Sequence, residues 1–199
     1  PEWSGVIPAL LPFGNILLTP FFGNLYDRKG KGATIMIIGS IMLIFIHLTF
    51  SIPMLDNWLV ALGLILLLGI AFSLVPSAMW PSVPKIIPEN KLGTAYALIF
   101  WIQNIGLWLF PLLIGKILTS TNEKLAMMVE KKEITEEVAS VSYDYKWPLL
   151  MLACLGLAAL LLGLYLKVID RKKNLGLEAP NIKAESVSVE EAEMADAEA

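Results

Sequence analysis

Five long stretches of the chain contain no charged side chain, and the charges gather in the segments between them. The stretches cover residues 3–22, 33–51, 58–80, 92–115 and 147–166. An α-helix rises about 1.5 Å per residue, so about 20 residues cross a hydrocarbon core about 30 Å thick. Each stretch is long enough to do so. The pattern therefore predicts an all-α integral membrane protein with five transmembrane helices in a lipid bilayer.

The composition agrees with a membrane protein and excludes several other classes. Of the 199 residues, 56% are hydrophobic and 17% are charged, against about 25% charged residues in an average soluble domain. The single cysteine, Cys154, lies inside an apolar stretch, so no disulfide scaffold is expected and the thiol is predicted to be buried. The net charge is −3 and no basic stripe is present, which excludes nucleic acid as a partner.

Lysine and arginine in the connecting segments predict the orientation, because cytoplasmic loops retain an excess of basic residues. The first connection (28–31), the third (85–91) and the segment after the last stretch (167–173) are basic, whereas the second (52–57) contains no basic residue. The loop 116–146 carries five lysines, but the alternation of five helices requires it to be external. The N-terminus is then external and the C-terminus cytoplasmic.

Two segments outside the apolar stretches have an expected structure of their own. In the external loop, Ser120 and Glu123 have the spacing of a capping box, which predicts a short surface helix. This helix is either a lid over the external mouth or, as its charges favour, a solvated connector. Residues 173–199 are acidic overall and contain no aromatic residue, which predicts a disordered cytoplasmic tail without a site.

Two of the apolar stretches carry amides near their centres. Asn15 lies among prolines in the first stretch, and Gln103 and Asn104 lie in the fourth beside Trp101. An amide in hydrocarbon is costly unless it is paired, and amides beside flat rings suit a neutral or zwitterionic solute. These four residues are therefore the expected substrate-binding site. Alternatively, the amides bond neighbouring helices.

The remaining polar residues of the apolar stretches favour structural roles over catalysis or proton transport. Serines and prolines between Ser73 and Pro88 predict a kinked hinge or gate, and His47 without a carboxylate partner favours a packing role over proton transport. The apolar stretches contain no paired carboxylates, no nucleophile with a base and no cluster of metal ligands. No catalytic residue, enzyme activity, metal or other cofactor is expected.

The connection between the first two stretches has a distinctive order of residues. It runs Gly-Asn-Leu-Tyr-Asp-Arg-Lys-Gly-Lys-Gly over residues 23–32, hereafter the glycine loop. Glycine permits close packing and positive φ, and Asp27 can accept hydrogen bonds from the N-terminus of a helix. The order resembles the signature loop of the major facilitator superfamily, which joins the second and third helices and again the eighth and ninth. The matching residues are Gly23, Leu25, Asp27, Arg28, Gly30 and Lys31.

The resemblance departs at two positions and has several implications. A small residue is usual where Tyr26 stands, and a base is usual where Gly32 stands, which puts close packing beside Tyr26 in question.

The five stretches would be helices eight to twelve of a twelve-helix transporter, forming most of its C-terminal six-helix half. The chain begins at Pro1 without a basic segment, so we expect a fragment whose partner is the missing N-terminal half. Gly23, Asp27, Arg28, Gly30 and Lys31 would then form a conformational switch, since in the resembled family this loop tethers the two halves when the cytoplasmic side is shut.

A second segment resembles a narrower family. Residues 81–97 and 102–107 are similar to the helix-eleven region of the lysosomal dipeptide uniporter family and its bacterial relatives. The resemblance implies transport of dipeptides or amino-acid-like molecules in a bacterial inner membrane or a eukaryotic lysosomal or plasma membrane. Organic anion and monocarboxylate antiporters of the same superfamily share a similar helix eleven and remain an alternative.

Together these features predict a secondary active or facilitative transporter of small polar solutes that works by alternating access. An intramembrane enzyme is disfavoured because the apolar stretches lack catalytic groups. A non-transporting membrane assembly subunit would need neither mid-helix amides nor the glycine loop. The absence of charge from the stretches favours a uniporter over a proton-coupled carrier.

Overall fold

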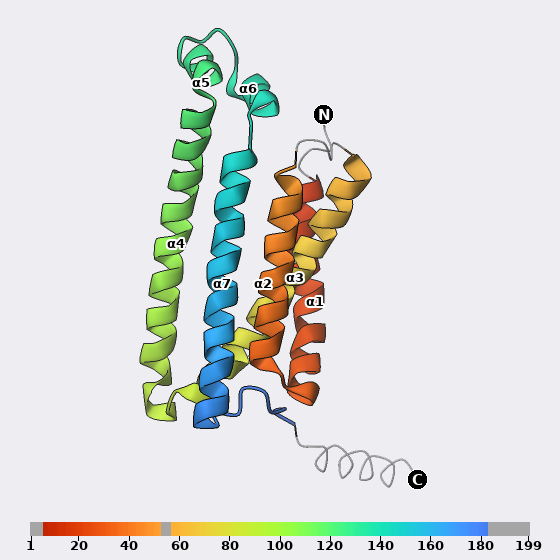
Figure 1. The fold of residues 1–199 in the computed structure, drawn as a ribbon, viewed down its shortest axis with the longest axis vertical. Helices are drawn as coiled ribbons and strands as arrows, with labels where there is room; N and C mark the ends of the chain where they lie inside the picture. The colour runs from red at the N-terminus through yellow and green to blue at the C-terminus, as the bar shows by residue number, and fades with distance from the viewer. Residues whose placement is uncertain (1–5, 53–56, 183–199) are drawn as a thin grey trace.

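The computed structural model describes residues 6–52 and 57–182, and the regular structure in these ranges is helical. The elements are α1 (Val6–Lys29), α2 (Gly32–Phe50), α3 (Trp58–Ile86), the 3-10 helix η1 (Glu89–Lys91), α4 (Leu92–Thr121), α5 (Glu123–Glu130), α6 (Glu136–Ser142) and α7 (Lys146–Lys173). The long helices run side by side, and α5 and α6 lie together at one end (Figure 1). The all-α fold is confirmed. Residues 3–5 of the first predicted helix lie outside the described residues.

Several helices extend beyond the charge-free stretches. α1 continues to Lys29, α3 to Ile86 and α7 to Lys173, and the last turns of α1 and α7 carry basic side chains. Cations at the C-terminal end of a helix are stabilised by the helix dipole. The absence of charge therefore marks the apolar span of each helix and not its ends.

Four of the described helical segments are long and apolar enough to cross a membrane: α2, α3, η1 with α4, and α7. The number of such helices differs from the predicted five, because α1 is not among them. α1 does occupy the first predicted stretch as a helix of 24 residues, and its described part includes Asn15, Asn24 and Asp27. The architecture of an all-α membrane bundle is unchanged by this difference.

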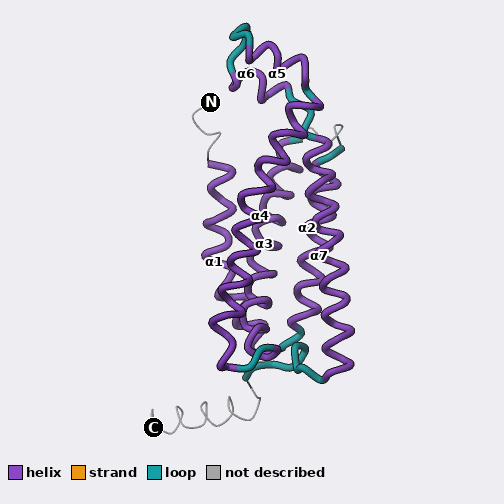
Figure 2. The backbone as a smooth tube through the Cα atoms, turned by 90° about the vertical axis from the view of Figure 1, so that its left-hand side faces the viewer, coloured by secondary structure: helices purple, strands orange, loops and turns teal. Residues whose placement is uncertain are grey.

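Helix α2 packs between α3 and α7, and glycines allow the close approach (Figure 2). A Cβ atom added to Gly156 would lie 2.9 Å from Ile44 Cγ1, and one added to Gly163 would lie 3.1 Å from Ile37 Cγ1. On the other side of α2, a Cβ atom at Gly39 would lie 2.5 Å from a methyl group of α3. Small residues let membrane helices gain close van der Waals contact where no hydrophobic driving force operates.

The junction between α3 and α4 is built around Trp80. Pro84 has no N–H to donate to the carbonyl of Trp80 one turn earlier, and the hydroxyl of Tyr96 donates to that carbonyl instead, at 3.4 Å. The ring of Trp80 also stacks on Phe100 with a centroid separation of 5.0 Å. The predicted gate region is helical as far as Ile86, where α3 ends, and contains three prolines within the helix; α4 supplies the missing donor for one of them.

The loop 116–146 folds into the short helices α5 and α6, so the prediction of a surface helix there is supported. The proposed capping box is wrong, because α4 continues to Thr121 and Ser120 donates to the Ile117 carbonyl within it. Asn122 closes the base of the loop: its Nδ2 donates to the Asp144 carbonyl at 3.2 Å, and its Oδ1 accepts from the Asp144 N–H at 2.8 Å. These two bonds fasten the end of α4 to the start of α7.

Candidate functional site

The glycine loop turns the chain from α1 into α2 through two residues with positive φ. Gly30 has φ 67° and Lys31 has φ 64°. The Gly30 N–H donates to the Tyr26 carbonyl at 2.7 Å. A Cβ atom on Gly30 would lie 2.5 Å from backbone atoms of Glu178 and Ala179. Gly30 is therefore required both by its conformation and by the chain that passes over it.

That passing chain is the segment that follows α7, residues 174–182, hereafter the strap. Asn174 and Gly176 have φ values of 50° and 76°, and they turn the chain back toward the glycine loop (Figure 1). Leu177 in the strap is completely buried. The prediction of a disordered acidic tail from residue 173 onward is wrong for residues 173–182, because Lys173 ends α7 and residues 174–182 form the strap. The paired left-handed residues Asn174 and Gly176 are the sequence signal that marks the turn. Residues 183–199 of the predicted tail lie outside the described residues.

The strap supplies the hydrogen-bond acceptors that the first turn of α2 lacks. The N-cap residue, Lys31, provides no side-chain cap. Its own N–H donates to the Glu178 carbonyl at 3.1 Å, and the Gly32 N–H donates to the Leu177 carbonyl at 2.9 Å. The Thr34 N–H donates to Glu178 Oε1 at 2.9 Å. A carboxylate at a helix N-terminus contributes about 0.3–1 kcal/mol through the helix dipole, so Glu178 stabilises both the strap and α2.

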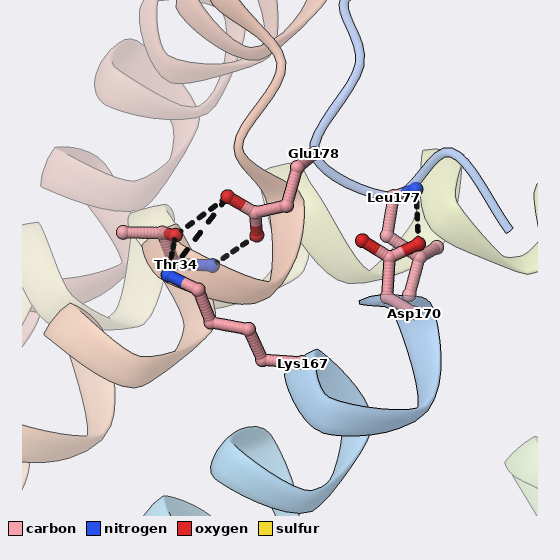
Figure 3. Close-up of polar contacts among 5 residues, drawn as sticks. All are labelled: Thr34, Lys167, Asp170, Leu177 and Glu178. Atoms are coloured by element: carbon pink, nitrogen blue, oxygen red, sulfur yellow. Dashed lines mark hydrogen bonds and ion pairs between the residues drawn. The ribbon is translucent and has the colours of Figure 1, made fainter. Parts of the chain in front are cut away.

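Glu178 also connects α2 to α7 (Figure 3). The Thr34 hydroxyl donates to Glu178 Oε2 at 2.7 Å, and Lys167 Nζ donates to that hydroxyl oxygen at 2.6 Å. The ammonium of Lys167 lies 4.0 Å from the carboxylate. Asp170, which is almost fully buried on α7, accepts the Leu177 N–H at 2.9 Å. The strap is thus bonded to α2 and α7 together.

Asp27, the acidic residue of the glycine loop, is held by the strap as well. Asn181 Nδ2 donates to Asp27 Oδ1 at 2.7 Å, and the N–H groups of Asn181 and Ile182 donate to the Asp27 carbonyl at 2.9 and 3.0 Å. In the described residues the carboxylate of Asp27 therefore has an amide partner from the same chain. Arg28 and Lys31 are exposed, and no described atom would lie within 4 Å of a Cβ on Gly23.

Tyr26 is completely buried at the centre of this end of the bundle. Its hydroxyl lies 3.3 Å from Ser82 Oγ, and Lys85 Nζ lies 5.1 Å from the centre of its ring. Lys85 also donates to the carbonyls of Gly176 and Ala179 at 3.1 and 2.7 Å. The close packing beside Tyr26 that its size put in question is therefore present, and α3 joins the strap through Lys85.

The predicted substrate-binding residues lie on α1 and α4. Asn15 is partly buried and its Oδ1 accepts the Thr19 hydroxyl at 2.8 Å. Gln103, Asn104 and Trp101 are exposed, and Asn104 Nδ2 donates to the Phe100 carbonyl at 2.8 Å. Figure 1 shows α1 and α4 at opposite sides of the bundle. The described residues therefore do not bring Asn15 together with the amides of α4, and the shared site stays a prediction.

Other predicted residues have plain structural positions. His47 Nδ1 lies 2.7 Å from the Leu43 carbonyl one turn earlier, which agrees with a packing role. Cys154 is exposed on α7, so the prediction that it is buried is wrong. An apolar side chain on the outside of a membrane helix faces lipid or another helix. Exposure in the isolated bundle therefore carries no cost here.

Four helices long and apolar enough to cross a membrane, with the glycine loop between α1 and α2, are typical of an integral membrane transporter. Comparison with known families matches residues 2–188 to the Major Facilitator Superfamily. The chain belongs to this superfamily, as the glycine loop indicated.

The chain also matches parts of individual proteins that are named as transporters. The chain is 34% identical to the lysosomal dipeptide transporter MFSD1 of Homo sapiens over 103 residues, which are 52% of this chain and 21% of that protein. It is 35% identical to the same transporter of Mus musculus over 103 residues, again 52% of this chain and 21% of that protein. It is 29% identical to the inner membrane transport protein YdiN of Escherichia coli (strain K12) over 105 residues, 53% of this chain and 24% of that protein. Each match thus spans about a quarter or less of the relative. No solved structure matches significantly.

Proposed function

We propose that this chain is the C-terminal part of a transporter that moves dipeptides or similar amino-acid-like solutes across a membrane by alternating access. The observation that carries the proposal is the match of residues 2–188 to a transporter superfamily. Relatives named as lysosomal dipeptide transporters favour this substrate class. The protein is then a carrier and not an enzyme, and the described residues hold no group of three or more potential metal ligands.

The substrate is proposed to bind near the middle of the membrane. Gln103 or Asn104 would bond the solute, with Trp101 packing against it and Asn15 contributing from α1. All three residues of α4 are exposed in the described bundle, so they are free to face a cavity that the remaining helices complete. A dipeptide offers amide and terminal groups that side-chain amides can both donate to and accept from.

The glycine loop and the strap are proposed to lie on the cytoplasmic side. Arg28, Lys29 and Lys31 lie on the loop, and Arg171 to Lys173 lie in the last turn of α7 at the same end of the bundle (Figure 1). Basic residues of this density are retained in the cytoplasm. Helices α5 and α6 would then be external. In the lysosomal membrane, external corresponds to the lumen.

The direct test is uptake of a labelled dipeptide panel into vesicles that contain the full-length protein. Uptake should be saturable and absent from empty vesicles, and it should need no pH gradient if the protein is a uniporter. A parallel panel of monocarboxylates and organic anions tests the antiporter alternative. Exchange of these anions without dipeptide uptake would replace the proposed substrate class, and no flux of either kind would favour a non-transporting assembly subunit.

A further inference from the structure

The strap has the contacts of a clamp across one end of the bundle. It bonds α1 through Asp27, α2 through Thr34, α3 through Lys85 and α7 through Asp170. The first three of these helices follow one another in the chain and α7 comes last, and all four have one end close to the strap (Figure 1). A nine-residue segment therefore joins the ends of all four helices. The strap forms no described bond to α4.

The glycine loop is shaped to receive the strap. The backbone of the strap passes so close to Gly30 that a Cβ there would lie 2.5 Å from the Glu178 carbonyl oxygen. A Cβ on Gly32 would lie 3.0 Å from the Leu177 carbonyl oxygen. Two glycines of the loop thus leave the space that the strap fills. The strap is part of the same site as the loop.

The forces that hold the strap are those of a releasable segment. Among its residues only Leu177 is completely buried, whereas residues 179–182 are exposed. The remaining polar contacts are hydrogen bonds and the partly exposed ion pair between Lys167 and Glu178, and water replaces such contacts at a small net cost. Segments with little buried apolar surface and exposed hydrogen bonds open at much lower free energy than the core. The strap can therefore leave the bundle without unfolding it.

We propose that the strap is a conformational clamp that closes over Asp27 and the start of α2 in one state of the protein and is released in another. This inference rests on the proposed function, because alternating access requires the cytoplasmic ends of the helices to move. Asn181 is the positioning residue of the clamp, since its side chain holds the Asp27 carboxylate. Glu178 fixes the clamp to α2 and α7.

The first test measures release of the strap and needs no substrate. In cysteine-free full-length protein, a single cysteine replaces Leu177, and its reaction with a maleimide is timed in unsealed membranes. Ala179→Cys gives the rate of an exposed strap position. Position 177 should react more slowly than position 179, and Asn181→Ala should accelerate it about three- to tenfold.

The matched control is Asn90→Ala, which removes an exposed asparagine of η1 that makes no side-chain hydrogen bond in the described residues. It should leave the reaction at position 177 unchanged. Equal rates at position 177 in the parent and in Asn181→Ala overturn the clamp. A reaction rate at position 177 of the parent as high as that at position 179 also overturns the clamp.

The second test locks the strap. Lys31 and Ala179 are exposed, and the Lys31 N–H donates to the carbonyl of Glu178 beside Ala179, so cysteines at 31 and 179 can be joined by an oxidant or a short cross-linker. Locking should slow dipeptide uptake severalfold and reduction should restore it, whereas the oxidant or cross-linker should leave the uptake of either single-cysteine variant as it was before treatment. Parent-like uptake by the locked protein overturns the clamp. Absence of uptake by the unmodified parent instead contradicts the proposed function, and the maleimide rates then decide the clamp by themselves.

Discussion

Tyr26 and Gly32 pack directly against each other, and the large ring of Tyr26 fits because Gly32 has no side chain. A Cβ on Gly32 would lie 2.8 Å from Cε2 of Tyr26 and 2.9 Å from Ser82 Oγ. These are the two positions at which the glycine loop departs from the superfamily pattern. The departures therefore compensate one another: the large ring at 26 occupies the space that a side chain at 32 would otherwise use.

This packing predicts a strong coupling between the two positions. Gly32→Ala should lower the free energy of unfolding of the full-length protein by about 1–3 kcal/mol, because overpacking displaces the buried ring. Tyr26→Ala should cost about 3–5 kcal/mol through the cavity it leaves. The double variant should cost less than the sum. Thermal unfolding in detergent measures all three, and strictly additive losses would show that the two residues do not compete for space.

Gly30→Ala should be more harmful than most glycine substitutions in this protein. Alanine at φ 67° is strained by about 1–2 kcal/mol, and its methyl group would collide with the strap backbone. Gly63→Ala is the matched control, because Gly63 lies in α3 with no described atom within 4 Å of an added Cβ. The control should stabilise the helix by up to about 1 kcal/mol. A similar melting temperature for both variants would contradict the close passage of the strap.

Asp27→Asn should slow transport more than it weakens binding. The residue lies at the end of the bundle, away from the mid-membrane amides, and its contacts are to the strap and not to a cavity. Equilibrium affinity for a dipeptide should stay within about threefold, since no proposed substrate contact is lost. Parallel measurement of binding and of uptake rate separates the two effects. Uptake equal to that of the parent would remove Asp27 from the conformational switch.

Replacement of the proposed substrate amides should weaken binding moderately. Gln103→Leu, Asn104→Leu and Asn15→Leu should each raise the dissociation constant of a dipeptide about two- to tenfold, the cost of one hydrogen bond. The Asn104 variant is harder to interpret, because it also removes the bond that the Asn104 amide donates to the Phe100 carbonyl. Membrane expression must be confirmed first. If all three variants bind like the parent, the amides serve the contacts between helices.

Tyr96→Phe should loosen the junction between α3 and α4. It removes the hydroxyl that compensates Pro84 at the Trp80 carbonyl but retains the ring beside Trp80. A loss of about 0.5–1 kcal/mol in unfolding free energy is expected, because the bond of 3.4 Å is long. Tyr165→Phe is the control, since its ring is exposed and its hydroxyl makes no bond in the described residues. Equal stability of both variants would show that the Tyr96 hydroxyl contributes nothing.

The sequence predicts the helical bundle well because exclusion of charge from hydrocarbon acts on each helix separately. Every long helix coincides with most or all of one of the charge-free stretches, and the glycine loop predicts the superfamily that the comparison with known families confirms. The strap is different. It is too short for an apolar span and mixes polar with apolar residues, and the buried position of Leu177 depends on the start of α2, where the Gly32 N–H donates to the Leu177 carbonyl from about 150 residues earlier in the chain. The amino-acid composition of a segment does not predict such a long-range contact.

The proposed substrate site shows what else the sequence does not predict. Amides at mid-helix are conspicuous by their cost in lipid, but periodicity does not say which helices they meet. Asn15 Oδ1 accepts a bond within its own helix and Asn104 Nδ2 donates to the preceding turn, so one polar atom of each amide is paired locally in the described bundle. Their role in a shared cavity depends on helices that would lie against α1 and α4.

The pair of bonds between Asn122 and Asp144 makes the α5–α6 segment a loop that is closed at its base. Because the ends are already fixed, extra residues at the tip add only loop entropy, about 0.6 kcal/mol for each doubling of length. The segment can therefore accept an inserted epitope or a small reporter domain near Lys132, whose φ of 59° marks the turn between the two helices. The membrane bundle beneath it would keep its packing.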